Sequence, residues 1–186
     1  MPDKPAPPRY LPGDPPPGKR LGEMLRVDHA GEYGAVRIYA GQLAVLGHHH
    51  RLSPAIRRMA AQEAQHLEAF DRLLVARHVR PSALSPFWHL SGFALGAVTA
   101  LLGERAAMAC TAAVEEVIDD HYERQRTALE DSDPALAETV AEFQADEAEH
   151  RATALELGAE EMPGYVLLAG VIKAGCRLAI AIAKKV

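Results

Sequence analysis

A repeated arrangement of acidic and imidazole side chains restricts the fold of this chain more than any other feature. Glutamate, a tyrosine seven residues later, and then a Glu-x-x-His motif occur in this order at Glu32, Tyr39, Glu63 and His66, and again at Glu115, Tyr122, Glu147 and His150. The two ends of a Glu-x-x-His motif share one helical face and can hold one metal ion together. One such motif arises easily by chance, whereas two matching sets predict two matching helix pairs.

Four long segments have helical periodicity, and each places apolar side chains on the face that carries the acidic or imidazole residues. The first runs from Leu21 to about Leu46, and the third from Glu104 to about Leu129. The second begins at Ser53-Pro54, with Ser53 as the expected N-cap, and ends near His78. The fourth follows Asp133, also an expected N-cap, and ends near Leu157.

Four carboxylates and two imidazoles suit two first-row metal ions, because four negative charges balance two divalent cations and both donor types bind such metals. A Glu from each of two helices, with Glu-x-x-His from each of two others, is the arrangement of ferritin-like di-iron and di-manganese bundles. We therefore predict an all-α fold, a ferritin-like four-helix bundle with two additional apolar helical segments. Proteins with such sites store iron, reduce or dismutate peroxide, or activate dioxygen to oxidise an organic substrate.

The two additional apolar segments are Phe87–Leu102 and Tyr165–Ala183. The first is shorter than the roughly 20 residues that a helix needs to cross a bilayer. In the second, Lys173, Arg177 and Lys184 form one basic stripe, which favours a helix lying flat with these groups toward anionic lipid head groups. Two interpretations stay open for each segment: a helix in the membrane interface, or a helix packed in or against the bundle.

The amino-terminal residues differ from the rest in composition. Residues 1–19 contain eight prolines, which fix the backbone in extended conformations, so we expect a disordered arm ahead of a single domain at residues 20–186. The start of the chain has no charged-then-apolar leader, which predicts a cytoplasmic protein. A net charge of -5 without a dense basic patch gives no support for nucleic-acid binding.

Several other polar residues have simpler expected roles. Asp28 and Asp146 are candidates to accept the second N–H of a ligand histidine, which would fix its tautomer. The adjacent residues 48–50 are all histidine, point in different directions on any regular structure, and are expected in an exposed loop. Cys110 and Cys176 lie far apart in sequence and in apolar surroundings, which predicts buried thiols rather than a disulfide.

Several motifs in this order resemble those of the demethoxyubiquinone hydroxylase family, from about Lys19 to the end of the chain. They are Asp28-His29-Ala30-Gly31-Glu32-Tyr33-Gly34-Ala35 with Arg37-Ile38-Tyr39-Ala40-Gly41-Gln42, Ala109-Cys110-Thr111-Ala112-Ala113-Val114-Glu115-Glu116 with His121-Tyr122, Asp146-Glu147-Ala148-Glu149-His150, and Ala174-Gly175-Cys176. The resemblance implies a di-iron monooxygenase that uses O2 to hydroxylate a polyprenylated 6-methoxy-3-methyl-benzoquinol in ubiquinone biosynthesis. It also implies a peripheral protein, which we expect on the cytoplasmic face of the cell membrane.

The resemblance also implies roles for individual residues. Two iron ions per chain would be held by Glu32, Glu63, His66, Glu115, Glu147 and His150. His121 and Tyr122 would belong to a hydrogen-bonded path linked to electron delivery, but a further tyrosine of that path in some members falls at about Ala181 here. No Gly-x-Gly-x-x-Gly motif is present, so the reductant would be external.

Two further questions stay open at this stage. The resemblance leaves room for contacts with other proteins of ubiquinone biosynthesis and for a homo-oligomer. From the same six ligands, the alternatives to the hydroxylase are a ferritin-like iron-handling protein and a peroxide-detoxifying protein.

Overall fold

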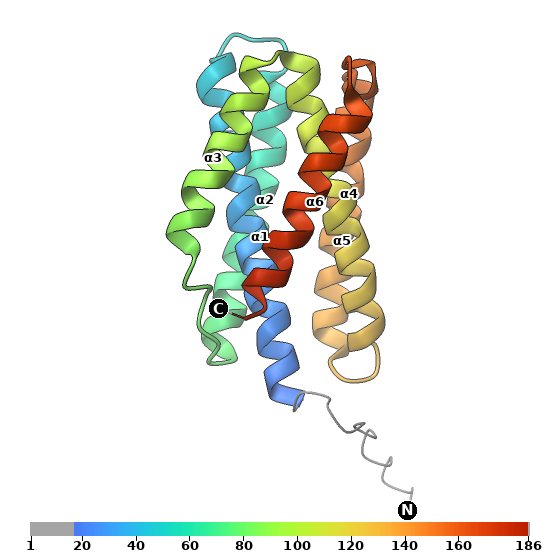
Figure 1. Ribbon diagram of the computed structural model, residues 1–186. Helices are drawn as coiled ribbons and strands as arrows, with labels where there is room; N and C mark the ends of the chain where they lie inside the picture. The colour runs from blue at the N-terminus through green and yellow to red at the C-terminus, as the bar shows by residue number, and fades with distance from the viewer. Residues whose placement is uncertain (1–16, 186) are drawn as a thin grey trace, which may run out of the picture.

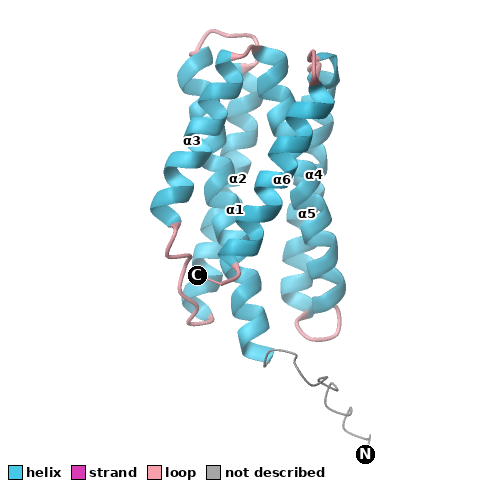
Figure 2. Ribbon diagram, in the orientation of Figure 1, coloured by secondary structure: helices cyan, strands magenta, loops and turns pink. Residues whose placement is uncertain are grey.

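The computed structural model describes residues 17–185, and over this range the chain forms helices and loops without a β-strand (Figures 1 and 2). The helices are α1 Pro17–Leu46, α2 Ser53–Ala76, α3 Ser85–Leu101, α4 Glu104–Leu129, α5 Pro134–Glu156 and α6 Tyr165–Ala183, with a 3-10 turn at Ala159–Glu161. The prediction of an all-α fold is confirmed, and the predicted ends of the helices agree with the observed ones to within a few residues.

Two local details differ from the sequence prediction. Helix α1 begins at Pro17, so the last residues of the predicted arm at residues 1–19 are helical, while residues 1–16 lie outside the described part of the chain. The hydroxyl of Ser53 does not cap α2: it donates to the carbonyl oxygen of Gly47 at 2.6 Å, and Leu52 precedes the helix. Asp133 does cap α5, because its carboxylate accepts from the backbone N–H of Leu136 at 3.3 Å.

Four long helices make up the bundle, in two antiparallel pairs, α1 with α2 and α4 with α5 (Figure 1). Helix α3 runs back along the bundle after α2, so α4 starts at the end where α1 stops and the two helices run in opposite directions. Two apolar clusters fill the interior: one contains Ile56 and Met59, and the other contains Leu25 and Phe70. The polar residues of the repeat lie on the four bundle helices, and Tyr39 belongs to the first cluster and Tyr122 to the second.

Helices α3 and α6 both cover the side of the bundle formed by α1 and α4, and within residues 17–185 neither contacts α2. Helix α3 approaches α1 closely because glycines on each helix lie against the backbone of the other. A Cβ atom added at Gly96 would overlap the carbonyl oxygen of Ile38, and one added at Gly41 would overlap that of Phe93. Any larger residue at these positions would therefore push the two helices apart.

The basic stripe of α6 has a different environment from the one expected. Lys173 donates to the carboxylate of Glu116 on α4 at 2.5 Å, and Arg151 of α5 donates to the same carboxylate at 3.1 Å. The Lys173 ammonium, the largest influence, together with the guanidinium groups of Arg151 and Arg177, holds the pKa of Glu116 below its ordinary value. Lys173 thus fixes α6 to the bundle and is not free for a lipid head group.

The outward sides of α3 and α6 are strongly apolar. Exposed large hydrophobic side chains include Phe87, Leu90, Val98 and Leu101 on α3 and Val166, Leu167, Val171 and Leu178 on α6. Helix α6 has a mean hydropathy of 2.0 over an 18-residue window, only 17% of which is buried, so by length and composition alone it could cross a membrane. Its contacts with α4, which include buried Ala169 and Ile172, place it along the bundle.

Candidate metal centre

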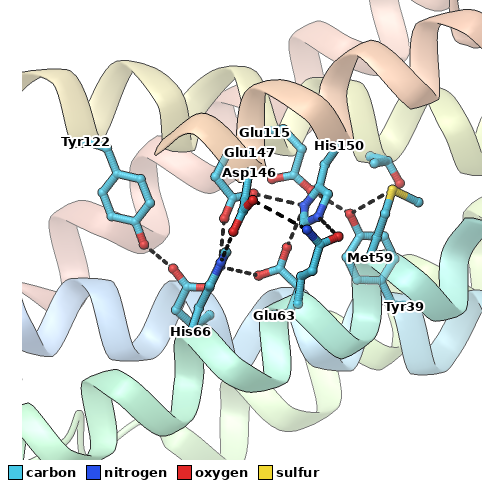
Figure 3. A network of polar contacts seen from close by, with 12 residues as sticks. Tyr39, Met59, Glu63, His66, Glu115, Tyr122, Asp146, Glu147 and His150 are labelled. Carbon is cyan, nitrogen blue, oxygen red and sulfur yellow. Dashed lines mark hydrogen bonds and ion pairs between the residues drawn. The ribbon is translucent and has the colours of Figure 1, made fainter. Parts of the chain in front are cut away.

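The structure brings the six predicted ligands together in the middle of the bundle (Figure 3). They form two groups, Glu32, Glu63, His66 and Glu147 in one, and Glu63, Glu115, Glu147 and His150 in the other. Within each group, one ligand atom from every residue lies within 4.8 Å of the others, and all six residues are buried. Glu63 and Glu147 belong to both groups, so the geometry suits two neighbouring ions that share two carboxylates.

Both histidines turn the same ring nitrogen toward the carboxylates. Nδ1 of His66 lies 3.3 Å from Glu147, and Nδ1 of His150 lies 3.0 Å from Glu63. The other nitrogen, Nε2, is 3.0 Å from the Asp146 carboxylate in His66 and 3.1 Å from the Gln62 side-chain oxygen in His150. These two oxygens accept from Nε2–H, which leaves Nδ1 available as a metal ligand.

The outer partners of the histidines were only partly predicted. Asp146 contacts a ligand histidine as expected, whereas Asp28 does not: its carboxylate lies 3.1 Å from Nε2 of His121 and accepts from Gln125 at 2.6 Å. Gln62 was missed. Its position directly before Glu63 was the one available signal, but glutamine beside glutamate is too common to identify a contact made across the bundle.

The two tyrosines of the repeat hold the glutamates of the opposite halves. Tyr39 on α1 donates to Glu115 on α4 at 2.7 Å, and Tyr122 on α4 donates to Glu32 on α1. Seven residues of helix rise about 10 Å, and α1 and α4 run in opposite directions, so each tyrosine reaches the level of the other helix's glutamate. Burial, followed by the charge of the facing glutamate, raises the pKa of both phenols well above 10.0, so both remain donors.

A second layer of side chains differs between the two ends of the site. Near Glu32, the amide of Gln125 bonds to Asp28, and His121 contacts the same carboxylate. At the equivalent place near Glu115, the amide of Gln42 donates to the hydroxyl of Thr111 at 3.3 Å. His121 is the more accessible of these groups, because it lines a surface cavity of about 370 Å³.

Burial and charge shift the pKa values of three carboxylates of the cluster, Glu63, Glu115 and Glu147, in different directions. Burial, and then the charge of Glu147, holds the pKa values of Glu63 and Glu115 well above 4.5. Burial by itself would also raise the pKa of Glu147, but the contacts from His150 and His66 outweigh it and bring the pKa to about 2. For His66, burial lowers the pKa, but the carboxylates of Glu147 and Glu32 raise it to about 10. Metal binding must therefore displace protons.

Unpaired polar atoms provide a test of whether the cluster fits metal ions. Within the described residues, nine buried side-chain nitrogen or oxygen atoms have no hydrogen-bond partner, and five of them belong to the predicted ligands Glu32, Glu63, His66, Glu115 and Glu147. Buried polar groups are normally satisfied because an unpaired one costs about 1–3 kcal/mol. Oxygen and imidazole nitrogen atoms gathered in one place without hydrogen bonds, even where they form ion pairs with one another, are a donor set that suits first-row metal ions.

Two simpler sequence predictions also have an outcome. The three histidines at residues 48–50 lie in the connection between α1 and α2, outside regular structure. Cys110 is buried and Cys176 is partly buried, and neither forms a disulfide. Burial raises their pKa values to about 12 and about 11, so both thiols stay protonated at neutral pH.

The fold and the site define an all-helical bundle with a buried carboxylate–histidine cluster that could hold a metal. Residues 19–183 match the family model described as "Ubiquinone biosynthesis protein COQ7", and the chain belongs to this family, in agreement with the resemblance found in its motifs.

Similar proteins have been named in bacteria and eukaryotes. A 3-demethoxyubiquinol 3-hydroxylase of Rhodospirillum rubrum is 52% identical over 176 residues, which cover 95% of this chain and 83% of the relative. The mitochondrial NADPH-dependent 3-demethoxyubiquinone 3-hydroxylase of Bos taurus is 50% identical over 169 residues, 89% of this chain and 77% of the relative. The mitochondrial 5-demethoxyubiquinone hydroxylase of Saccharomyces cerevisiae is 40% identical over 182 residues, 89% of this chain and 78% of the relative.

Proposed function

We propose that the protein is a ferritin-like di-iron monooxygenase of ubiquinone biosynthesis, which hydroxylates a polyprenylated 6-methoxy-3-methyl-benzoquinol with O2. The observation that carries this proposal is the pair of buried ligand groups that share Glu63 and Glu147, in a chain whose relatives are named as demethoxyubiquinol or demethoxyubiquinone hydroxylases. Two shared carboxylates suit a pair of ions that change oxidation state, because a carboxylate can shift between terminal and bridging binding.

Each predicted ligand has a definite place in this proposal. Glu32 and His66 would hold one iron and Glu115 and His150 the other, with Glu63 and Glu147 available to both. When bound, the iron pair supplies the electrons and the oxygen chemistry for hydroxylation of the ring. Tyr39 and Tyr122 hold Glu115 and Glu32 in place by hydrogen bonds. Asp146 and Gln62 fix the orientation of the two histidine rings.

The reductant must come from outside the chain. The name of the Bos taurus relative specifies NADPH, and we extend this dependence to the present protein. Two adjacent residues support a path for electrons: His121 lines a surface cavity, and Tyr122 donates to Glu32. We propose that electrons from the reductant reach the irons through these two residues.

The apolar outward sides of α3 and α6 support association with a membrane. A substrate with a polyprenyl tail dissolves in the bilayer, so an enzyme that lies on the bilayer surface has direct access to it. Helices α3 and α6 cover α1 and α4, the helices that carry Glu32 and Glu115, and the exposed leucines and valines of both cover helices would contact acyl chains. A membrane-spanning α6 would lose the contact between Lys173 and Glu116, so the proposed helix lies along the surface.

Quinone analysis of a strain that lacks this protein tests the activity. The strain should accumulate the demethoxy quinone, and the wild-type gene should restore ubiquinone. The Glu147→Ala variant should fail to restore it, while Glu149→Ala, which removes an exposed carboxylate from the same helix, should succeed. Full restoration by Glu147→Ala would contradict the proposed site. Iron analysis should give two irons per chain, whereas many irons per chain would indicate storage instead.

A further inference from the structure

Two adjoining cavities lie at the end of the molecule where α1 begins and α6 stops. One, of about 660 Å³, is lined by residues of α1, the α2–α3 connection and the end of α6. The other is the cavity of about 370 Å³ beside His121. Both are lined by Glu23 and Lys184, so they adjoin at these two side chains, and we call the two cavities together the basic pocket.

The basic pocket concentrates positive charge in a chain whose net charge is -5. The larger cavity is lined by Lys19, Arg26, Arg80, Lys184 and Lys185, and the smaller one adds Arg20 and Arg124. Glu23 is the one carboxylate among the lining residues. So many cations close together repel one another, and a bound anion would relieve this repulsion.

Ion pairs inside the protein do not neutralise this charge. Between residues 17 and 185, Arg124 is the one lining cation with a carboxylate within 4.0 Å, the exposed Asp120 at 3.8 Å. Arg26 donates from Nε to the backbone oxygen of Arg80 at 3.2 Å, a contact that orients its side chain without reducing its charge. Lys184 and Lys185 are exposed at the end of α6.

The position of the pocket connects it with the apolar surface of α3 and α6. Lys184 and Lys185 directly follow α6, and Arg80 lies just before α3 in the chain. Farther along α6, Lys173 is engaged with Glu116 and Arg177 is a single exposed cation, whereas Lys184 and Lys185 at this end adjoin the other cations that line the pocket. An anion in the pocket would lie at the same end of the molecule as the exposed Phe87 and Leu90 of α3 and Leu178 of α6. A phosphate attached to acyl chains matches this combination.

We propose that the basic pocket binds the phosphate of an anionic phospholipid head group and so orients the protein on the membrane. This inference rests on the proposed membrane association and adds to it the lipid class and the residues that recognise it. The apolar sides of α3 and α6 provide attraction to any bilayer, and the pocket provides the preference for anionic ones.

Vesicle binding by the full-length, iron-loaded protein tests the proposal. One set of vesicles contains phosphatidylcholine alone, and the other contains phosphatidylcholine with phosphatidylglycerol. The wild-type protein should bind the anionic vesicles more tightly, and the preference should weaken with salt. The double variant Lys184→Glu with Lys185→Glu should lose about tenfold in affinity for anionic vesicles and little for neutral ones. Arg80→Glu should also lower the affinity for anionic vesicles more than the affinity for neutral ones.

The matched control reverses two charges on the other side of the bundle, Arg58→Glu with Arg72→Glu on α2. Equal binding to both vesicle types, or an equal loss in the control, would overturn the head-group site and leave the membrane proposal intact. Binding to neither vesicle type by a folded protein would remove the membrane proposal, and the pocket proposal with it. Release from anionic vesicles by dilute NADPH would assign the pocket to a nucleotide and overturn the lipid assignment.

Discussion

At the scale of single residues, the orientation of the two ligand histidines depends on groups that would not themselves touch a metal. Asp146 and Gln62 accept from Nε2 of His66 and His150, so both rings turn Nδ1 toward the carboxylates. The amide of Gln62 also reaches Asp146 at 3.4 Å, so the two outer partners support each other. Losing either one frees a ring to rotate.

Removing Asp146 should therefore weaken metal binding without removing a ligand. We expect Asp146→Ala to lower the affinity for iron by about 10- to 100-fold, since outer partners of ligand histidines have effects of this size. Glu149→Ala is the control, because Glu149 is exposed three residues away on the same helix. Competition with a calibrated chelator measures the affinity. Equal affinities of the two variants would show that Asp146 does not position His66.

The crossed tyrosine contacts predict a specific pattern of energetic coupling. Tyr39 lies seven residues after Glu32 but donates to Glu115. In double-mutant cycles on the metal-free protein, Tyr39→Phe should couple with Glu115→Leu by about 1 kcal/mol, and its effect should be additive with Glu32→Leu. Urea unfolding measures each free energy. Coupling to Glu32 instead would mean that tyrosine and glutamate of the same half interact.

The clustering of the six candidate ligands could be predicted from the sequence because it depends on helical spacing within single segments and on a repeat. The crossed tyrosines and Gln62 could not, because they depend on the relative direction of two helices and on contacts across the bundle. Asp28 shows the same limit: it was a candidate partner of a ligand histidine, but its observed partners His121 and Gln125 lie on α4, more than 90 residues later.

At the scale of helices, glycines at the contact between α3 and α1 allow the two backbones to pack closely. Gly96→Ala should destabilise the protein by about 1–3 kcal/mol, because the new methyl group meets the backbone of α1. Gly175→Ala on α6 is the matched control: nothing lies within 4 Å of its added methyl, so helix propensity should stabilise it by up to about 1 kcal/mol. Urea unfolding compares the two variants. Effects of the same sign would contradict close packing at Gly96.

In helix α6, the periodicity of the sequence shows which residues share a face but not which surroundings that face contacts. The spacing of Lys173 and Arg177 correctly indicated a shared face, but not what that face would meet. Glu116 on α4 supplies a carboxylate for Lys173, and Arg151 on α5 approaches it as well. Lys173 therefore turns toward the bundle, while Arg177, Lys184 and several large apolar residues of α6 are exposed.

At the scale of the whole molecule, the metal-free protein should become less stable as the pH rises. The pKa values of Glu63 and Glu115 are raised, so the unfolded chain ionises above 4.5 while the folded protein keeps these protons, and stability falls. His66 acts in the same direction: its contribution is complete below 6.5 and is lost as the pH rises toward about 10. Glu147 contributes above 4.5 and loses its contribution only as the pH falls toward 2.

Thermal unfolding in the presence of a chelator, at several pH values from 6.5 upward, measures this effect. The midpoint should decrease with pH in the metal-free protein. With iron bound, the decrease should be smaller or reversed, because the ions replace the protons and bind more tightly as the ligands ionise. A midpoint that rises with pH in the metal-free protein would show that the carboxylates are already ionised without metal.

The second layer of the site makes its two ends chemically unequal. An approximate two-fold rotation relates the halves of the chain, so the six ligands alone would give two interchangeable positions. Asp28 and His121 occupy the places that Thr111 and Ile38 take in the other half, and Ile38 belongs to an apolar cluster with residues of α6. One end thus has an ionisable pair next to solvent, and the other has a hydroxyl and hydrocarbon. Under the proposed function, the end with Asp28 and His121 would suit proton transfer, and the apolar end would suit the ring of the substrate.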